Sequence, residues 1–343
     1  MKNAFVLPTH TPALLTQAIR EAAAALCAGE VVALPTETVY GLAANALDPE
    51  AVRTIFSIKG RPSTNPVIVH VAGLDMITRC VDHWPPMAQA LANAFWPGPL
   101  TLVLKKSATI PSIVSANGDT VGIRWPSHPV MQAIIQECGL PLAAPSANPS
   151  NQLSPTNALH VQRLLGEKLR LIVDGGQSQV GIESTVVDVT GSEARVLRPG
   201  MIHETDIRKV VRMAAPGTAA ASDSSSTGIA RSPGLMAKHY SPQAKLRILT
   251  WESDADLTQA LRPELERHQR IHVIAHRRIP LKAPLPEAQV KVIPDDAEAY
   301  ARALYAELHQ CDEAQADLIV VEAVRETPEW KAVADRLRRA ATT

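Results

Sequence analysis

The first part of the chain shows both the hydrophobic period of an α-helix and the hydrophobic period of a β-strand. Residues 12–28 (PALLTQAIREAAAALCA) read as an amphipathic helix that ends at Gly29, because a left-handed helix end favours glycine. EVVALPT then predicts a buried strand that is broken by Pro35. We expect further strands at 67–72, 100–104, 121–125, 141–144, 171–173 and 185–189, and helices near 49–58, 86–94, 128–138 and 156–166. Because these elements do not alternate strictly, the pattern predicts a twisted mixed sheet with helices packed on it.

The last hundred residues have a more regular pattern. Strands are predicted for LRILTW, IHVIAH, VKVIP and ADLIVVEAV, and helices for 254–269, 295–311 and 328–341. This order predicts a small doubly wound α/β unit. The unit has no GxGxxG motif and no catalytic constellation, which favours a structural or regulatory role.

The segment AAPGTAAASDSSSTGIARSPG, residues 214–234, differs from both parts. It is rich in Ser, Ala, Gly and Thr and has no periodic apolar face, so it reads as a flexible linker. We therefore predict a first domain over residues 1–212, a linker with a lid segment over 213–242, and a second domain over 243–343.

Composition narrows the class of protein. With 343 residues and 46% apolar residues, the chain can form packed cores in two domains. Lys+Arg and Asp+Glu are 34 each, which argues against tight non-specific nucleic-acid binding but allows a local basic groove. The four cysteines show no CxxC spacing, and there is no 18-residue apolar run and no signal-peptide pattern. We expect a soluble, cytoplasmic protein with reduced thiols and no membrane contact.

Polar residues of one chemical type gather between the expected strands of the first domain. Lys59, three arginines, hydroxyls and amides dominate there, and acidic residues are few. This set suits the binding of anions and of a small zwitterion rather than acid–base hydrolysis, which needs paired carboxylates or a nucleophile with its base. Walker, HExxH and GxSxG motifs are absent. The segments are LPTETVYGL, KGRPSTNP, VGIRWPSHP, APSANPSNQLSPT, GIEST and VLRPG.

Each of these features also has an ordinary interpretation. GRP and NP are common turns, and His70 could be a hydrogen-bonded core residue. Arg124 could belong to a surface ion pair, while its neighbour Trp125 reads as a core residue. Only their combination points to a function.

Six blocks in one order carry a resemblance to a known family. They are LPTETVYGL, KGRPSTNPVIVHV, PGPLTLVL, VGIRWPSHP, PLAAPSANPS and GIESTVVDV, followed by SPGLMAKHYSP at 232–242. In this order they resemble the YrdC/Sua5 family of threonylcarbamoyl-AMP synthases in its long form with a C-terminal domain. The resemblance implies a YrdC-like twisted mixed sheet followed by a small Rossmann-like α/β domain.

The resemblance also implies an activity. Members of the family make threonylcarbamoyl-AMP and pyrophosphate from L-threonine, bicarbonate (or CO₂) and ATP. A downstream threonylcarbamoyl transferase then modifies adenosine 37 of tRNAs reading ANN codons. Mg²⁺ is expected with the triphosphate, and the nucleotide would supply most of its ligands because the sequence offers no acidic cluster for it.

Individual roles follow from the same resemblance. Lys59 and Arg61 would be the catalytic residues that bind phosphates, on a loop stiffened by two prolines. The planar fork of Arg124 would bind the threonine carboxylate. The expected threonine residues are Thr38, His70, Arg124, Ala144 and Ser184, and the expected ATP residues are Arg61, Asn65, Thr120, Ser146, Ser154, Arg198 and Tyr240.

The sequence departs from the family pattern at two places. Ala144 stands where some members carry a hydroxyl residue, so its backbone would contribute instead. The run LMAKHY differs from the MKYRHY-like run of other members, which leaves the role of Lys238 open.

Two other functions compete with synthesis. A double-stranded RNA or tRNA binding module could use the same surface without catalysis, but residues 1–212 carry 17 Lys/Arg against 16 Asp/Glu, which opposes a basic domain. Related carbamoyl-transfer proteins of hydrogenase maturation add zinc-finger-like cysteines, and this chain has none in that spacing.

Overall fold

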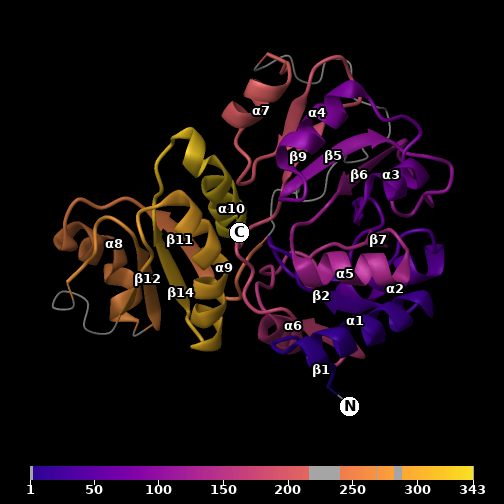
Figure 1. Ribbon diagram of the computed structural model, residues 1–343. Coiled ribbons are helices and arrows are strands. Elements are labelled where there is room, and N and C mark those ends of the chain that lie inside the picture. The colour runs from indigo at the N-terminus through magenta and orange to yellow at the C-terminus, as the bar shows by residue number, and fades with distance from the viewer. Residues whose placement is uncertain (1–2, 216–239, 268, 282–287, 343) are drawn as a thin grey trace. The chain divides into compact units, whose positions relative to one another are not determined.

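The computed structural model of the chain describes residues 3–215, 240–267, 269–281 and 288–342. They form two compact units, of which unit 1 comprises Met1–Ser150 and Pro155–Leu235, and unit 2 comprises Asn151–Ser154 and Met236–Thr343 (Figure 1). The chain therefore contributes four residues of the segment 144–156 to unit 2. Residues 216–239, with most of the expected linker and lid, lie outside the described residues, so the lid stays a prediction.

Unit 1 is built on a ten-stranded sheet with the order β1-β8-β2-β3-β7-β4-β6-β5-β9-β10. Parallel pairs such as β1 with β8 occur beside antiparallel pairs such as β5 with β6, which confirms the predicted mixed sheet. The strands are β1 Phe5–Pro8, β2 Val32–Leu34, β3 Gly41–Asn45, β4 Ile68–His70, β5 Leu100–Lys105, β6 Thr120–Arg124, β7 Leu142–Ala143, β8 Leu171–Asp174, β9 Thr185–Asp188 and β10 Arg195–Arg198.

Local signals start and stop the helices of unit 1. Thr11 caps α1 by accepting a hydrogen bond from Leu14 N, and Gly29 follows the helix with a positive φ of 80°. Asp48 caps α2, which ends at Gly60 in the left-handed conformation. The helices are α1 Pro12–Cys27, α2 Pro49–Lys59, α3 Leu74–Cys80, α4 Pro86–Phe95, α5 Pro129–Cys138, α6 Ala158–Leu165 and α7 Glu204–Val210.

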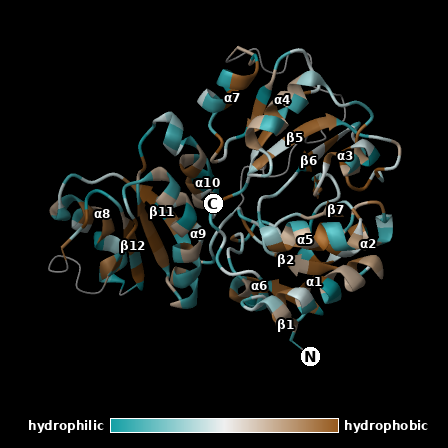
Figure 2. Cartoon of the chain, viewed as in Figure 1, coloured by the Kyte–Doolittle hydropathy of each residue, from teal (hydrophilic) through white to brown (hydrophobic). Residues whose placement is uncertain are grey.

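Helices cover both faces of this sheet. Side chains of α1 and α5 share one core cluster with Val32 and Leu34 of β2. Side chains of α2, α4 and α6 join another cluster with Ala33, the residue between them. Successive strand residues point to opposite faces, so one strand supplies two cores. Strand β5, for example, is mostly brown in the hydropathy view (Figure 2).

The structure adds elements that the pattern did not predict. Segment 41–45, of which only the first two residues belonged to the quoted segment LPTETVYGL, is β3 and pairs antiparallel with β2 and β7. Unit 1 also continues past residue 212, because Ala214 N donates to Ala194 O. Elements β1, α3 and α7 were not predicted either.

Unit 2 contains a four-stranded sheet with the order β11-β14-β12-β13, in which every pair is parallel. This arrangement agrees with the predicted small α/β unit. Ser253 and Asp256 form a capping box at the start of α8. The elements are β11 Lys245–Leu249, α8 Asp254–Glu266, β12 Ile271–Ala275, β13 Gln289–Val292, α9 Ala297–Glu313, β14 Leu318–Glu322, a 3₁₀ turn Pro328–Trp330 and α10 Lys331–Ala341. In the described parts of both units, no helix is long and apolar enough to cross a membrane.

Candidate functional site

The turn after β2 is organised by one threonine. Thr36 Oγ1 donates to Val39 O at 2.6 Å and accepts from the backbone N–H groups of Thr38 and Val39 at 3.2 Å each. Hydroxyl side chains commonly stabilise turns in this way. The result is a buried turn that places Glu37 and Thr38 beside β6.

Arg124, the last residue of β6, is the centre of a buried polar group. Its Nη1 donates to Thr38 Oγ1 at 2.9 Å, its Nε donates to Gly98 O at 3.4 Å, and its Nη2 lies 2.9 Å from Glu37 Oε1. The Arg124 and Glu37 side chains are 5% and 8% exposed. Arg124 therefore forms a buried pair rather than a surface pair.

His70 lies directly opposite Arg124 in the β4–β6 register. Burial, together with the charge of Arg124, lowers the pKa of His70 to about 3. His70 is consequently a neutral imidazole at neutral pH. Three of the residues expected to bind threonine, Thr38, His70 and Arg124, thus come together.

Ser184 lies near this group and is held by two residues. Its Oγ is 2.8 Å from Thr101 Oγ1, and Arg198 donates from Nη2 to the same Oγ and from Nε to Ser184 O, both at 3.1 Å. Thr185 N donates to Pro99 O, next to the Gly98 carbonyl that Arg124 contacts. Arg198, expected at ATP, therefore contacts the segment of Ser184.

Lys59 ends α2 and joins it to the loop after β7. Its Nζ donates to Ser146 O and Asn148 O at 2.5 Å each and to Asn148 Oδ1 at 3.3 Å. Burial and the charge of Arg61 lower the pKa of Lys59, whereas three acceptor oxygens favour its protonated form. The ammonium group orders the segment that carries Ser146.

Arg61 and Asn65 lie in the same short loop. Arg61 Nε donates to Asn65 O at 3.2 Å and its Nη2 donates to Pro66 O at 2.8 Å, while its guanidinium lies 5.9 Å from the centre of the Phe56 ring. These contacts hold the Arg61 side chain against its own loop.

The remaining predicted residues fall in two places. Thr120 begins β6, and Ala144 follows β7 with its N–H donating to Ile68 O at 3.1 Å. Ser154 and Tyr240, both expected at ATP, belong to unit 2, where His309 Nε2 lies 3.1 Å from Ser154 O. Tyr240 is buried, with its ring against Tyr305 and under the guanidinium of Arg336.

Sequence reasoning assigned no role to Glu37, Thr101 or Gly98. Glu37 stood in the quoted segment LPTETVYGL, and an acid in a set dominated by cations and hydroxyls was the available signal. Its contact with Arg124 joins residues 87 positions apart, which local pattern does not reveal.

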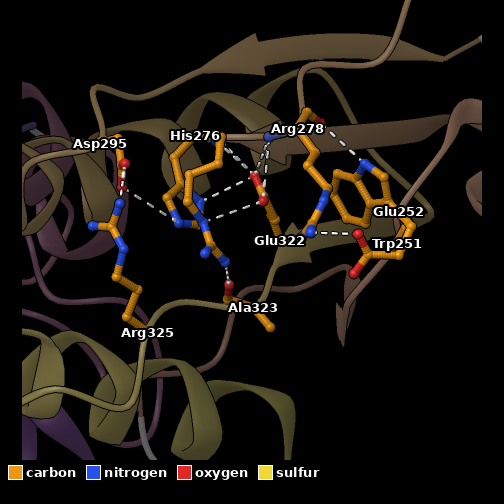
Figure 3. Close-up of polar contacts among 9 residues, drawn as sticks. Trp251, Glu252, His276, Arg278, Asp295, Glu322, Ala323 and Arg325 are labelled. Atoms are coloured by element: carbon orange, nitrogen blue, oxygen red, sulfur yellow. Dashed lines mark hydrogen bonds and ion pairs between the residues drawn. The ribbon is translucent and has the colours of Figure 1, made fainter.

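Unit 2 has a separate polar group at the carboxyl ends of β12 and β14 (Figure 3). Glu322 accepts backbone N–H bonds from His276, Arg277 and Arg278, and His276 Nδ1 lies 3.2 Å from Glu322 Oε2. Ligands of doubly wound folds bind at this end of the sheet. Here a carboxylate of the chain itself accepts from the turn, which favours a structural role.

The first unit thus defines an α/β protein that gathers a buried arginine–glutamate pair, a neutral histidine and hydroxyls at strand ends. A family model described as telomere recombination matches residues 24–200, and one described as the C-terminal domain of threonylcarbamoyl-AMP synthase matches 202–342. The chain belongs to the YrdC/Sua5 family of threonylcarbamoyl-AMP synthases, as its sequence blocks predicted.

Similar proteins span nearly the whole chain. The threonylcarbamoyl-AMP synthase of Pyrococcus abyssi is 38% identical over 325 residues, which cover 94% of this chain and 93% of the relative. That of Bacillus subtilis is 41% identical over 329 residues, covering 94% and 92%. The crystal structure of P. abyssi Sua5 complexed with L-threonine matches with a TM-score of 0.86 and 35% identity over 98% of this chain and 97% of that one. These names support the enzyme rather than the RNA-binding alternative.

Proposed function

We propose that this protein is an L-threonylcarbamoyladenylate synthase, a nucleotidyltransferase that makes threonylcarbamoyl-AMP and pyrophosphate from L-threonine, bicarbonate or CO₂, and ATP. The observation that carries the proposal is the 38% identity to a synthase over 94% of this chain and 93% of that enzyme. The buried group around Arg124 supports it, because a guanidinium among hydroxyls suits the carboxylate of an amino acid.

The chemistry has two steps. Threonine in its ammonium form reacts with bicarbonate to give a carbamate, one water and one proton. A carbamate oxygen then attacks the α-phosphorus of ATP, and the bond to the β-phosphate oxygen breaks to release pyrophosphate. Both substrates are anionic at the reacting end, so the protein has to position them and neutralise their charge.

We assign the residues of unit 1 to these tasks. Arg124 binds the threonine carboxylate, with Thr38, Ser184 and the backbone of Ala144 beside the substrate. His70, neutral because its pKa is about 3, exchanges hydrogen bonds with threonine without adding charge. Arg61 stabilises the phosphates, and Lys59 acts at least by ordering the segment of Ser146.

The proposed reaction also needs Mg²⁺ and residues that bind ATP. Mg²⁺ enters on the triphosphate, and the described residues contain no group of three or more His, Cys, Asp or Glu side chains that could hold it. Asn65, Thr120, Ser146 and Arg198 are the ATP residues of unit 1 in this proposal. Ser154 and Tyr240, which the sequence also predicted at ATP, belong to unit 2. We place the reaction in the cytoplasm. There a downstream transferase would transfer the threonylcarbamoyl group of the product to tRNA, and this protein would contact tRNA weakly.

Pyrophosphate release tests the proposal. Purified full-length protein is incubated with Mg²⁺, ATP, L-threonine and bicarbonate, and each component is omitted in turn. We expect release to require all of them. Equal release without threonine would remove the assignment, and micromolar RNA binding without ATP turnover would favour the RNA-binding module instead.

A further inference from the structure

Glu37 is a buried carboxylate to which the proposed reaction assigns no step. Its Oε1 lies 2.9 Å from Arg124 Nη2, and its side chain is 8% exposed. Its two carboxylate oxygens are closed off from solvent, and no contact to them from the described residues meets hydrogen-bond geometry. Glu37 therefore faces the guanidinium rather than an open surface.

The contacts of Arg124 define which of its donors stay available for a ligand. A guanidinium has five N–H groups, and Arg124 donates one to Thr38 Oγ1 and one to Gly98 O, while its Nη2 makes an ion pair with Glu37 outside hydrogen-bond geometry. Within the described residues, one N–H of Nη1 and the N–H groups of Nη2 have no hydrogen-bond acceptor, so each terminal nitrogen keeps a donor for a ligand. Two such donors match the two oxygens of a carboxylate.

Glu37 also balances the charge of this arginine. Burial raises the pKa of Glu37, but Arg124 and the backbone N–H of Ser127 lower it by more, so the carboxylate is ionised at neutral pH. His70, the other titratable group facing Arg124, is neutral. An unpaired buried guanidinium would turn toward other acceptors or toward water.

We propose that Glu37 is a positioning residue that holds the Arg124 guanidinium in the orientation that binds the threonine carboxylate. The inference rests on the proposed function and adds a specificity element to it. Glu37 acts through Arg124 and touches neither substrate. Its loss should impair recognition of threonine while leaving recognition of ATP intact.

Glu37→Gln tests this in the full-length protein, because it keeps the shape and removes the charge. We measure L-threonine binding by calorimetry, the KM values for threonine and ATP, and kcat. We expect threonine Kd and KM to rise about 10- to 100-fold, because the Arg124 guanidinium loses its charged partner, while the ATP KM stays within about twofold. Glu50→Gln is the matched control, since Glu50 pairs with Arg53 on the surface.

A double-mutant cycle separates positioning from general stability. If Glu37 acts through Arg124, Glu37→Gln should change threonine binding little in an Arg124→Lys background. Additive effects would overturn the inference, as would an unchanged threonine KM in the single variant. Thermal melting of each variant shows whether it is folded at the assay temperature.

A second variant covers the case in which Glu37→Gln does not fold. Glu37→Asp keeps the charge and withdraws the carboxylate by one methylene, so the guanidinium must follow it. We expect the threonine KM to rise, by less than in Glu37→Gln, with the ATP KM unchanged; an unchanged threonine KM would contradict the proposal. If the wild type shows no threonine-dependent turnover, the proposed function fails rather than the role of Glu37.

Discussion

Lys59 Nζ lies 2.5 Å from the backbone oxygen of Ser146, a residue 87 positions further along the chain. The same ammonium group donates to Asn148 O and Asn148 Oδ1. One cation thus connects the end of α2 to the loop after β7. The loop depends on it, because backbone oxygens without a donor are costly when buried.

Lys59→Met should destabilise unit 1 and abolish activity together. The variant keeps the apolar stem but leaves two backbone oxygens without their donor, at about 2–4 kcal/mol in total. Urea unfolding of the full-length protein measures the loss. Lys168→Met is the control, because Lys168 Nζ also donates to a backbone oxygen of α2, that of Ile58, but does so at a solvent-exposed position. Wild-type stability in Lys59→Met would show that the loop is held by other contacts.

Arg61→Ala and Arg124→Ala should separate the two substrates. Removing a charged partner of a bound anion costs about 2–4 kcal/mol, or roughly 30- to 1000-fold in the affected constant. We expect Arg61→Ala to raise the ATP requirement and Arg124→Ala the threonine requirement. Steady-state kinetics with each substrate varied in turn decides this. Loss of the same substrate in both variants would refute the division of roles.

Glu322→Gln should destabilise unit 2 without changing the chemistry of unit 1. The glutamine amide keeps one oxygen for the three backbone N–H groups but loses the negative charge that strengthened these bonds, and its NH2 group replaces the second acceptor oxygen. We expect a loss of about 2–3 kcal/mol in unfolding free energy. Glu252→Gln, at an exposed partner of Arg278, should change it little. Equal stability of both variants would argue against the structural role of Glu322.

Stability of the protein should fall as the pH drops below about 6.5. The pKa of His70 is lowered to about 3 in the folded chain, so the unfolded chain binds the proton first and its uptake favours unfolding. The pKa values of Glu37 and Glu322 are also lowered, which extends the loss below the ordinary range for glutamate. Urea unfolding between pH 7 and pH 4 checks this. His70→Gln should reduce the loss of unfolding free energy in the upper part of this pH range. An unchanged loss would contradict a neutral His70 in the folded chain.

Much of the architecture was encoded in short stretches of sequence. The helix start at Pro12 depends on Thr11, and the end of α2 depends on Gly60, so each signal and its effect lie within a few residues. Apolar runs such as 100–104 and 171–173 became β5 and β8 because a buried strand needs apolar residues on both faces. Local physics suffices for these elements.

Only part of the candidate site could be predicted from the sequence. Thr38, His70 and Arg124 were identified by their residue types and their positions at strand ends, and the structure brings them together. The tertiary structure alone revealed the pairing of Glu37 with Arg124 and placed Tyr240 within unit 2. The reason is physical: a cap or a periodic face is set by neighbours in the chain, whereas a buried ion pair between residues 87 positions apart is set by the order in which strands join the sheet.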